Sequence, residues 1–196
     1  MNLFETLSEE SIQKYADRII KARESDLLIQ SPQELGRWLA LISLRDDVNV
    51  YMEIGTSAGG TFRLTREVLL EKNPGVMCIA VDDGSDVGFR DFLPWYNTNP
   101  NNVILIQKDI DGLNESIPPV DLCLLDAAHT YELTKAAFQY AAANMFTNGL
   151  IAFHDTTESR CPGVGQAVED ISNTTDWKRV AHFSNQFGFT VLGKIE

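Results

Sequence analysis

Apolar residues recur along the chain with two different periods, and the period changes near residue 45. Residues 9–23 place apolar side chains three or four positions apart, which is typical of a helix with one buried face. Residues 32–44 have the same spacing, and Pro32 stands where proline commonly begins a helix. The pattern therefore predicts two helices within residues 1–45.

From residue 46 onwards, short apolar runs alternate with stretches of helical spacing. The predicted strands are 48–54, 76–82, 103–107, 120–126 and 149–154, and the predicted helices are 60–72, one within 86–97, 131–146 and 164–173. Continuous apolar runs are typical of parallel strands covered by helices on both faces. Two last runs, 177–183 and 187–194, are spaced as a hairpin. We predict an α/β fold with a doubly wound, seven-stranded, mostly parallel sheet and an antiparallel terminal hairpin strand.

Length and composition favour one globular domain. The chain has 196 residues, of which 44% are apolar and 22% charged. We expect residues 1–196 to form a single domain, with a helical cap at 1–45 on a core at 46–196. The apolar runs are shorter than the roughly 18 residues of a membrane span. The acidic N-terminal segment does not resemble a signal peptide, and the cysteines are odd in number, so we expect a cytoplasmic protein with reduced thiols.

The charge balance narrows the partners. Lys and Arg together number 16 and Asp and Glu 28, which gives a formal net charge of −12. A surface this acidic repels nucleic acid and anionic membranes. We therefore expect a small-molecule partner, no nucleic acid and no membrane; a homo-oligomer is compatible with the sequence.

A glycine-rich loop follows the first predicted strand. Residues 53–60 are EIGTSAGG, at the sheet position where ligands of doubly wound folds bind. Gly55 permits a tight turn, and Gly59 lets the backbone approach a ligand as a helix begins. Ser57 stands where a dinucleotide motif needs its second glycine, and no phosphate-loop lysine follows. The loop favours a nucleoside ligand without a pyrophosphate; the alternative is a simple tight turn.

An acidic residue ends the second predicted strand. Asp82 is one βα unit beyond Glu53, so the two residues belong to neighbouring strands of the predicted sheet. A carboxylate at this strand end can accept both hydroxyls of a ribose. The alternative for Asp82 is an ordinary solvated turn residue.

Acidic and histidine side chains follow the fourth and fifth predicted strands. Asp126 and His129 follow one strand, and His154 with Asp155 ends the next. Neighbouring strands lie about 4.8 Å apart, so their carboxylates can share one hard cation. Asp126 and His129 share a face if a helix begins there. The alternatives are that Asp155 and Thr156 only cap a helix and that His154 is a packing residue that points away from the site.

The loop E-x-G-x-x-x-G-G and the acid after the second strand resemble class I S-adenosylmethionine-dependent methyltransferases. The resemblance covers residues 48–194 and implies a Rossmann-like methyltransferase fold. It implies that the loop contacts the methionine part of the cofactor, that Asp82 binds the ribose and that Asp109 flanks the adenine. The implied cofactor-binding residues are Glu53, Gly55, Thr56, Ser57, Gly59, Asp82, Asp109 and Asp126.

A second motif, D-x-x-H-x-Y followed by G-x-I-x-x-H-D, resembles the branch that contains macrolide-sugar O-methyltransferases and cephalosporin-hydroxylase-like proteins. This resemblance implies that Asp126 and Asp155 hold a divalent ion such as Mg²⁺. It implies that His129 is the catalytic base, with Asp126 as its catalytic partner. Thr156 departs from the pattern of catechol O-methyltransferase-like enzymes, which have an asparagine ligand there, so the third metal ligand is open.

Three functions follow from these residues. The leading hypothesis is O-methylation of a small hydroxylated molecule, such as a sugar or a phenol, with metal assistance. The second is a cofactor-binding module without transfer activity. The third is a hydroxylase-like protein in which His129, His154 and Asp126 supply the residue types of an iron facial triad.

Overall fold

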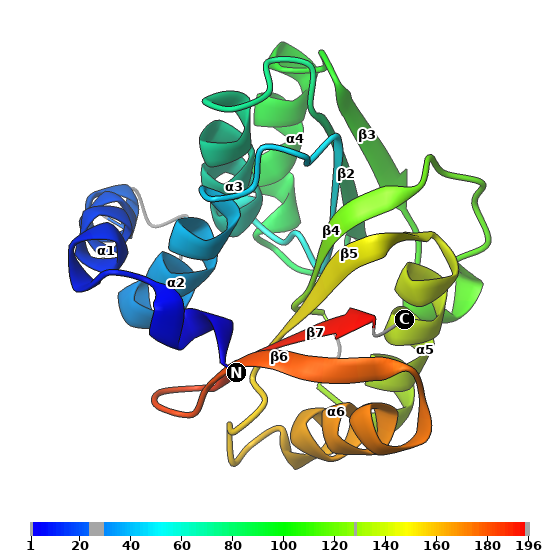
Figure 1. Ribbon diagram of the computed structural model, residues 1–196. Coiled ribbons are helices and arrows are strands. Elements are labelled where there is room, and N and C mark those ends of the chain that lie inside the picture. The colour runs from blue at the N-terminus through cyan, green and yellow to red at the C-terminus, as the bar shows by residue number, and fades with distance from the viewer. Residues whose placement is uncertain (1, 24–29, 128, 195–196) are drawn as a thin grey trace.

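The computed structural model describes residues 2–23, 30–127 and 129–194, and they form a three-layer α/β structure (Figure 1). Its elements in chain order are η1 (Leu3–Thr6), α1 (Glu9–Arg23), α2 (Pro32–Ile42), β1 (Val50–Ile54), α3 (Gly60–Leu70), β2 (Met77–Asp82), α4 (Phe89–Thr98), β3 (Val103–Gln107), η2 (Ile110–Gly112), β4 (Val120–Leu125), α5 (Tyr131–Ala143), β5 (Met145–His154), α6 (Pro162–Thr174), β6 (Trp177–Phe183) and β7 (Phe189–Lys194). Within the described residues, no helix is long and apolar enough to cross a membrane.

The strands form one seven-stranded sheet in the order β3-β2-β1-β4-β5-β7-β6. β1 pairs in parallel with both β2 and β4, so the strand order reverses between β1 and β4. β7 runs antiparallel to both of its neighbours, β5 and β6. The predicted fold class is confirmed, and the reversal point beside β1 is where ligands of such sheets bind.

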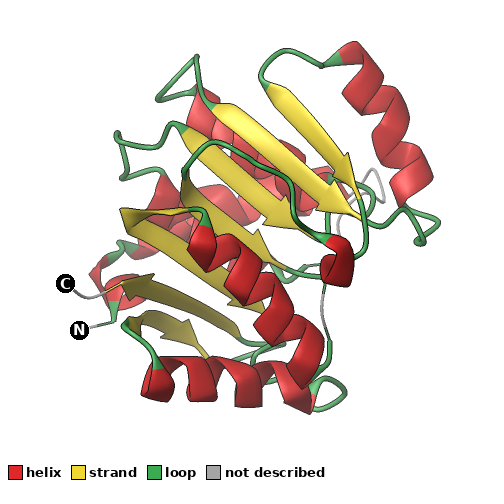
Figure 2. Ribbon diagram, turned by 90° about the vertical axis from the view of Figure 1, so that its right-hand side faces the viewer, coloured by secondary structure: helices red, strands yellow, loops and turns green. Residues whose placement is uncertain are grey.

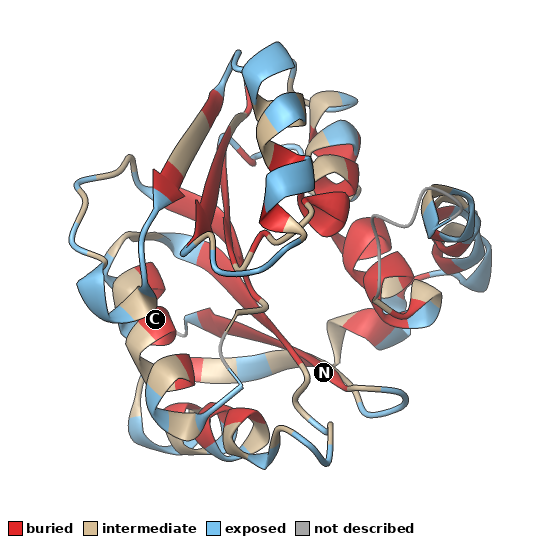
Figure 3. Ribbon diagram, turned by 180° about the vertical axis from the view of Figure 1, so that it is seen from behind, coloured by how far each residue is buried: buried red, intermediate tan, exposed pale blue. Residues whose placement is uncertain are grey.

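Alternate residues of the buried strands face two apolar layers. Tyr51 and Leu124 point into the layer that contains side chains of α2, α3 and α4. Met52 and Cys123 point into the opposite layer, formed with α5 and α6. Figure 2 shows the helices packed along the sheet, and Figure 3 shows the central strands buried between them. Burial on both faces explains why these strands are continuous apolar runs.

The N-terminal helices pack onto the sheet through α2. Trp38 is fully buried, and its ring centroid lies 5.9 Å from that of Phe189 in β7. Gly36 allows α1 to approach closely, because a Cβ there would lie 3.2 Å from the backbone nitrogen of Ala16. The expected cap therefore shares an apolar layer with the core, while the assignment of residues 1–196 to a single domain stays a prediction.

The boundary between α5 and β5 differs from the prediction. The apolar pair Met145 and Phe146 favoured a helix to residue 146, but α5 ends at Ala143. The chain turns there, and Val120 donates a backbone hydrogen bond to Asn144 over 2.8 Å. β5 therefore begins at Met145, with an irregularity in its pairing with β4. Pairing with a distant strand outweighs the local helical pattern at this point.

Candidate active site

The loop between β1 and α3 turns sharply over the carboxyl edge of the sheet. Gly55 has a φ of +95° and Gly59 a φ of +78°, in the region that favours glycine. A Cβ on Gly55 would lie 2.5 Å from the backbone nitrogen of Ala127, which belongs to the loop after β4. Gly55 is therefore required for the close approach of two loops as well as for the turn.

Asp82 ties this loop to the end of β2. One carboxylate oxygen accepts a hydrogen bond from the backbone nitrogen of Ser57 at 2.8 Å, and the other accepts from Gly84 at 2.8 Å. Asp82 is buried and borders a cavity of about 300 Å³, so it is not a solvated turn residue. Asp109 borders the same cavity and makes no side-chain cap to η2.

Glu53 is a buried acid at the end of β1. It is 1% exposed, and the Tyr51 hydroxyl donates a hydrogen bond to its carboxyl group. Burial raises the pKa of Glu53 well above its usual range. The hydrogen bond from Tyr51 opposes this shift in pKa, while the negative charges of Asp126 and Asp82 reinforce it. The site thus favours the protonated form of Glu53.

A larger cavity of about 480 Å³ extends from the glycine loop to the ends of β4 and β5. Both volumes are of the size of small-molecule sites. Every residue predicted for the site borders one cavity or both. The larger cavity is bordered by Glu53, Gly55, Thr56, Ser57, Gly59, Asp126, His129 and Asp155, and the smaller by Gly55, Ser57, Asp82, Asp109, Asp126 and His129. The structure therefore brings all predicted site residues together.

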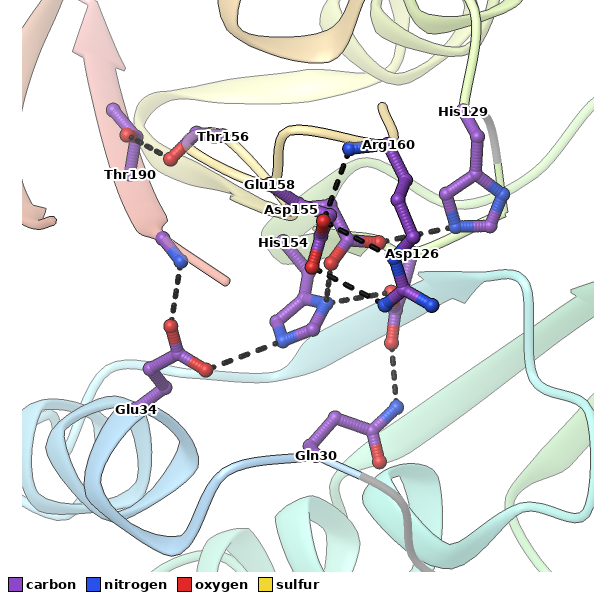
Figure 4. A network of polar contacts seen from close by, with 11 residues as sticks. Gln30, Glu34, Asp126, His129, His154, Asp155, Thr156, Glu158, Arg160 and Thr190 are labelled. Atoms are coloured by element: carbon purple, nitrogen blue, oxygen red, sulfur yellow. Dashed lines mark hydrogen bonds and ion pairs between the residues drawn. The ribbon is translucent and has the colours of Figure 1, made fainter. Parts of the chain in front are cut away.

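The acids and histidines after β4 and β5 form one network of polar contacts (Figure 4). His154 Nδ1 lies 3.1 Å from an oxygen of Asp126 and 3.2 Å from an oxygen of Asp155. The second oxygen of Asp155 lies 3.0 Å from His129 Nε2. His154 is buried, whereas 53% of the His129 side chain is exposed. A single aspartate, Asp155, thus connects a buried histidine to an accessible one.

The network shifts the pKa of His154, Asp155 and His129. Burial lowers the pKa of His154, but the surrounding carboxylates, Asp126 foremost, outweigh burial and raise it to about 12. Burial raises the pKa of Asp155, and its contacts with His129 and His154 outweigh that and hold it well below the usual range. The contact with Asp155 raises the pKa of His129. Without another cation present, a charged His154 separates the two aspartates.

The structure decides two points about the histidines that the sequence left open. His154 does not point away from the site. It lies on the same side of β5 as Ala152, which packs in the apolar layer that contains α2, and it borders the cavity of about 480 Å³. His129 does not share a helical face with Asp126, because α5 begins only at Tyr131. Its imidazole contacts Asp155 instead. Asp155 itself has a φ of +62°, a strained backbone for a non-glycine residue, rather than a helix-capping role.

The iron triad of the hydroxylase-like alternative does not form among the described residues. Within the described residues, the metal-ligand types converge as Asp126 with His154 and Asp155, and as His129 with Asp155 and Cys161. His129 and His154 are therefore not in one group with Asp126. This arrangement removes the geometric support for the hydroxylase-like alternative.

Two further residues of the site come from the N-terminal segment and were not predicted. Gln30 Nε2 donates a hydrogen bond to Asp126 Oδ2 over 2.7 Å. Glu34 is fully buried in α2, where one oxygen accepts a hydrogen bond from the backbone nitrogen of Gly188 at 2.6 Å. Its other oxygen lies 3.5 Å from His154 Nε2. The sequence does hold one signal for Glu34, an acid beside Leu35 at the start of an apolar helical stripe.

Comparison with known families identifies the class of protein. A family model described as a methyltransferase domain matches residues 52–156, which is more than half of the chain. The chain therefore belongs to this methyltransferase family. The predicted resemblance to class I methyltransferases is confirmed, and with it the prediction of an enzyme.

Solved structures agree on the fold. An O-methyltransferase from Bacillus cereus in complex with SAH has a TM-score of 0.69 and 15% identity, covering 98% of this chain and 100% of that one. An O-methyltransferase involved in tomaymycin synthesis, from Streptomyces achromogenes in complex with SAM, has a TM-score of 0.67 and 15% identity over 96% and 91% of the two chains. A SAH-bound methyltransferase from Podospora anserina has a TM-score of 0.66 and 10% identity over 97% and 90%. Among curated protein sequences, none matches.

Proposed function

We propose that this enzyme transfers the methyl group of S-adenosylmethionine to a hydroxyl oxygen of a small molecule such as a sugar or a phenol. The observation that carries the proposal is the adjacency of two cavities. One lies beside the glycine loop and Asp82, and the other reaches the network of His129 and Asp155. A nucleoside site and an acid–base site thus meet at the same loop.

The described residues fit the proposed cofactor. Each oxygen of Asp82 accepts one backbone hydrogen bond, which leaves further lone pairs for the two ribose hydroxyls. We assign the methionine part to the larger cavity, which is bordered by Glu53, Gly55, Thr56, Ser57 and Gly59, and the adenine to the smaller cavity beside Asp109. When bound, the cofactor supplies a methyl group on a positively charged sulfur. Asp126 and Asp155 border the same cavity, where their carboxylates favour a cationic ligand.

His129 is the proposed general base. Its half-exposed imidazole borders both cavities, so an acceptor hydroxyl can reach it. Asp155 orients the ring through Nε2 and stabilises the positive charge that the ring gains when it takes the hydroxyl proton. The proton then leaves to solvent from the exposed ring. Alignment of the hydroxyl oxygen with the methyl group supplies the rest of the rate enhancement.

Asp126 and Asp155 are the proposed ligands of a divalent cation. Their carboxylate chemistry fits a hard ion, and each has one oxygen directed at the same point beside His154. A bound cation lowers the pKa of a coordinated hydroxyl group. Asp126 keeps its orientation through the hydrogen bond from Gln30.

The test is transfer of tritium from methyl-labelled S-adenosylmethionine to a panel of sugars, catechols and phenols, with and without added divalent cations. The matched control for each acceptor is its deoxy or methoxy analogue, which lacks the reacting hydroxyl. We expect label in hydroxyl compounds only. Cofactor binding without transfer to any member of a broad panel would instead favour a binding module, and calorimetry without cofactor binding would overturn the proposal.

A further inference from the structure

We propose that His154 is the third ligand of the cation at Asp126 and Asp155, and that the site therefore selects a transition-metal ion over Mg²⁺. This inference rests on the part of the proposed function that places a cation there. It replaces the expectation of Mg²⁺, which was based on the two carboxylates alone.

The first argument is the convergence of three ligand atoms. His154 Nδ1 is 3.1 Å from an Asp126 oxygen and 3.2 Å from an Asp155 oxygen, and the three ligand atoms all lie within 4.8 Å of one another. Adjacent ligand atoms of an octahedral site with bonds of about 2.1 Å lie about 3 Å apart. The two separations from His154 Nδ1 to the carboxylate oxygens are thus those of neighbouring ligands in such a site.

The second argument is that His154 is buried without a well-formed hydrogen bond. The residue is 8% exposed, and within the described part of the chain neither ring nitrogen makes a hydrogen bond of acceptable geometry. A polar atom left without a partner in a protein interior is destabilising. Nδ1 points at the space shared with the two carboxylates, where a cation would satisfy its lone pair (Figure 4).

The third argument is that the remaining polar atom of each ligand is held from outside. Asp126 Oδ2 accepts a hydrogen bond from Gln30, and Asp155 Oδ2 contacts His129. The atoms left over are Asp126 Oδ1, Asp155 Oδ1 and His154 Nδ1, and these are the three that converge. A cluster of acids that merely repel one another would not have this division between inner and outer atoms.

Glu34 completes the arrangement on the histidine. Metal-bound histidines usually direct the other ring nitrogen at a carboxylate or carbonyl, which fixes the tautomer. Glu34 places an oxygen 3.5 Å from His154 Nε2, and its second oxygen is anchored by the backbone nitrogen of Gly188. Since Glu34 is fully buried in α2, its carboxylate needs a partner, and the Nε2–H of a metal-bound His154 supplies one. Glu34 is therefore a positioning residue for the proposed ligand.

The donor set explains the selectivity. Mg²⁺ prefers oxygen ligands and keeps several of its waters, whereas an imidazole nitrogen suits first-row transition ions such as Fe²⁺, Co²⁺ and Zn²⁺. Asp126, His154 and Asp155 all border the cavity of about 480 Å³, from which a substrate hydroxyl or water can reach the proposed ion.

The experiment uses the full chain, freed of metal with a chelator, and titrates it by calorimetry with Co²⁺, Mn²⁺ and Mg²⁺. We expect Co²⁺ to bind at least about 100-fold more tightly than Mg²⁺. The decisive variant is His154→Gln, whose amide reaches toward Glu34 but has no atom in place of Nδ1. It should reduce the Co²⁺ to Mg²⁺ affinity ratio by about 10-fold or more, and Glu34→Gln should weaken Co²⁺ binding by about 10–100-fold. His182→Gln, which changes a histidine outside the site, should leave the ratio unchanged.

A second readout identifies the ligand without relying on activity. Electron spin echo modulation of bound Mn²⁺ detects a coordinated imidazole nitrogen, and we expect this signal in the wild type and not in His154→Gln. Equal affinity for Mg²⁺ and Co²⁺, or a nitrogen signal that persists in a folded His154→Gln protein, would overturn the inference. Cofactor titration separates the two proposals: cofactor binding without metal binding refutes only this inference, and metal binding without cofactor binding refutes only the proposed function.

Discussion

His129, in the loop before α5, and Asp155, at the end of β5, are joined by a contact of 3.0 Å between Nε2 and Oδ2. The contact orients an accessible imidazole from the side opposite to solvent, and it raises the pKa of His129. The same aspartate directs its other oxygen at the buried His154. The proposed base and the proposed metal ligands are therefore coupled through one carboxylate.

Replacing His129 should separate catalysis from cofactor binding. His129→Ala should lower turnover by about 10²–10⁴-fold, the usual contribution of a positioned base. Cofactor affinity should change little, because the ring contacts Asp155 and not Asp82 or the glycine loop, which are assigned to the cofactor. Turnover and calorimetric affinity measured on the same preparation test this. His182→Ala is the matched control, since His182 contacts Thr190 in the terminal hairpin. Turnover within about three-fold of the wild type would show that His129 is not the base.

Asp82 should determine cofactor affinity. Asp82→Ala should weaken S-adenosylmethionine binding by about 2–3 kcal/mol, through loss of charge-assisted hydrogen bonds to the ribose. Asp46→Ala is the control, because the exposed Asp46 carboxylate pairs with Lys72 and is not among the residues that border the two cavities. Calorimetry gives both affinities, and melting temperatures exclude a general loss of structure. Equal affinities for the two variants would contradict the ribose assignment.

Gly55 should be sensitive to a single added methyl group. Gly55→Ala should lower the free energy of unfolding by about 1–3 kcal/mol, because alanine is strained at its positive φ and its Cβ meets the loop of Ala127. Gly112→Ala should have little effect, since a Cβ there has nothing within 4 Å. Denaturant titration of both variants checks the difference. A Gly55→Ala protein as stable as the wild type would show that the turn relaxes.

Trp38 should link the N-terminal helices to the stability of the whole chain. Trp38→Ala should cost about 3–5 kcal/mol, as expected for a large buried aromatic residue. If residues 1–196 are one domain, near- and far-ultraviolet circular dichroism should report a single coincident transition in wild type and variant. Leu44→Ala is the control, because Leu44 is 65% exposed. Two separate transitions would indicate that the cap at 1–45 unfolds independently.

The sheet and the glycine loop were predictable from sequence because their signals are local. The strand Met77–Asp82 is buried on both faces, so most of its positions are apolar and the run is visible without any partner. Gly55 and Gly59 satisfy backbone conformations that the sequence reveals by residue type alone. Asp82 and Asp155 were found because parallel strands end at one edge of a sheet, which makes their meeting a consequence of topology.

The partners of those residues were decided only by tertiary structure. Whether His154 packs or binds depends on what lies beyond the end of β5, and that is Glu34, 120 positions earlier in the chain. The contact of Gln30 with Asp126 likewise exists only because α2 packs against β7 and brings the N-terminal segment over the sheet edge. Hydrophobic periodicity shows which face of a helix or strand is buried, but it carries no information about which distant carboxylate meets that face. The contacts among the proposed metal ligands, and the contacts that hold those ligands in place, therefore appear only in the folded chain.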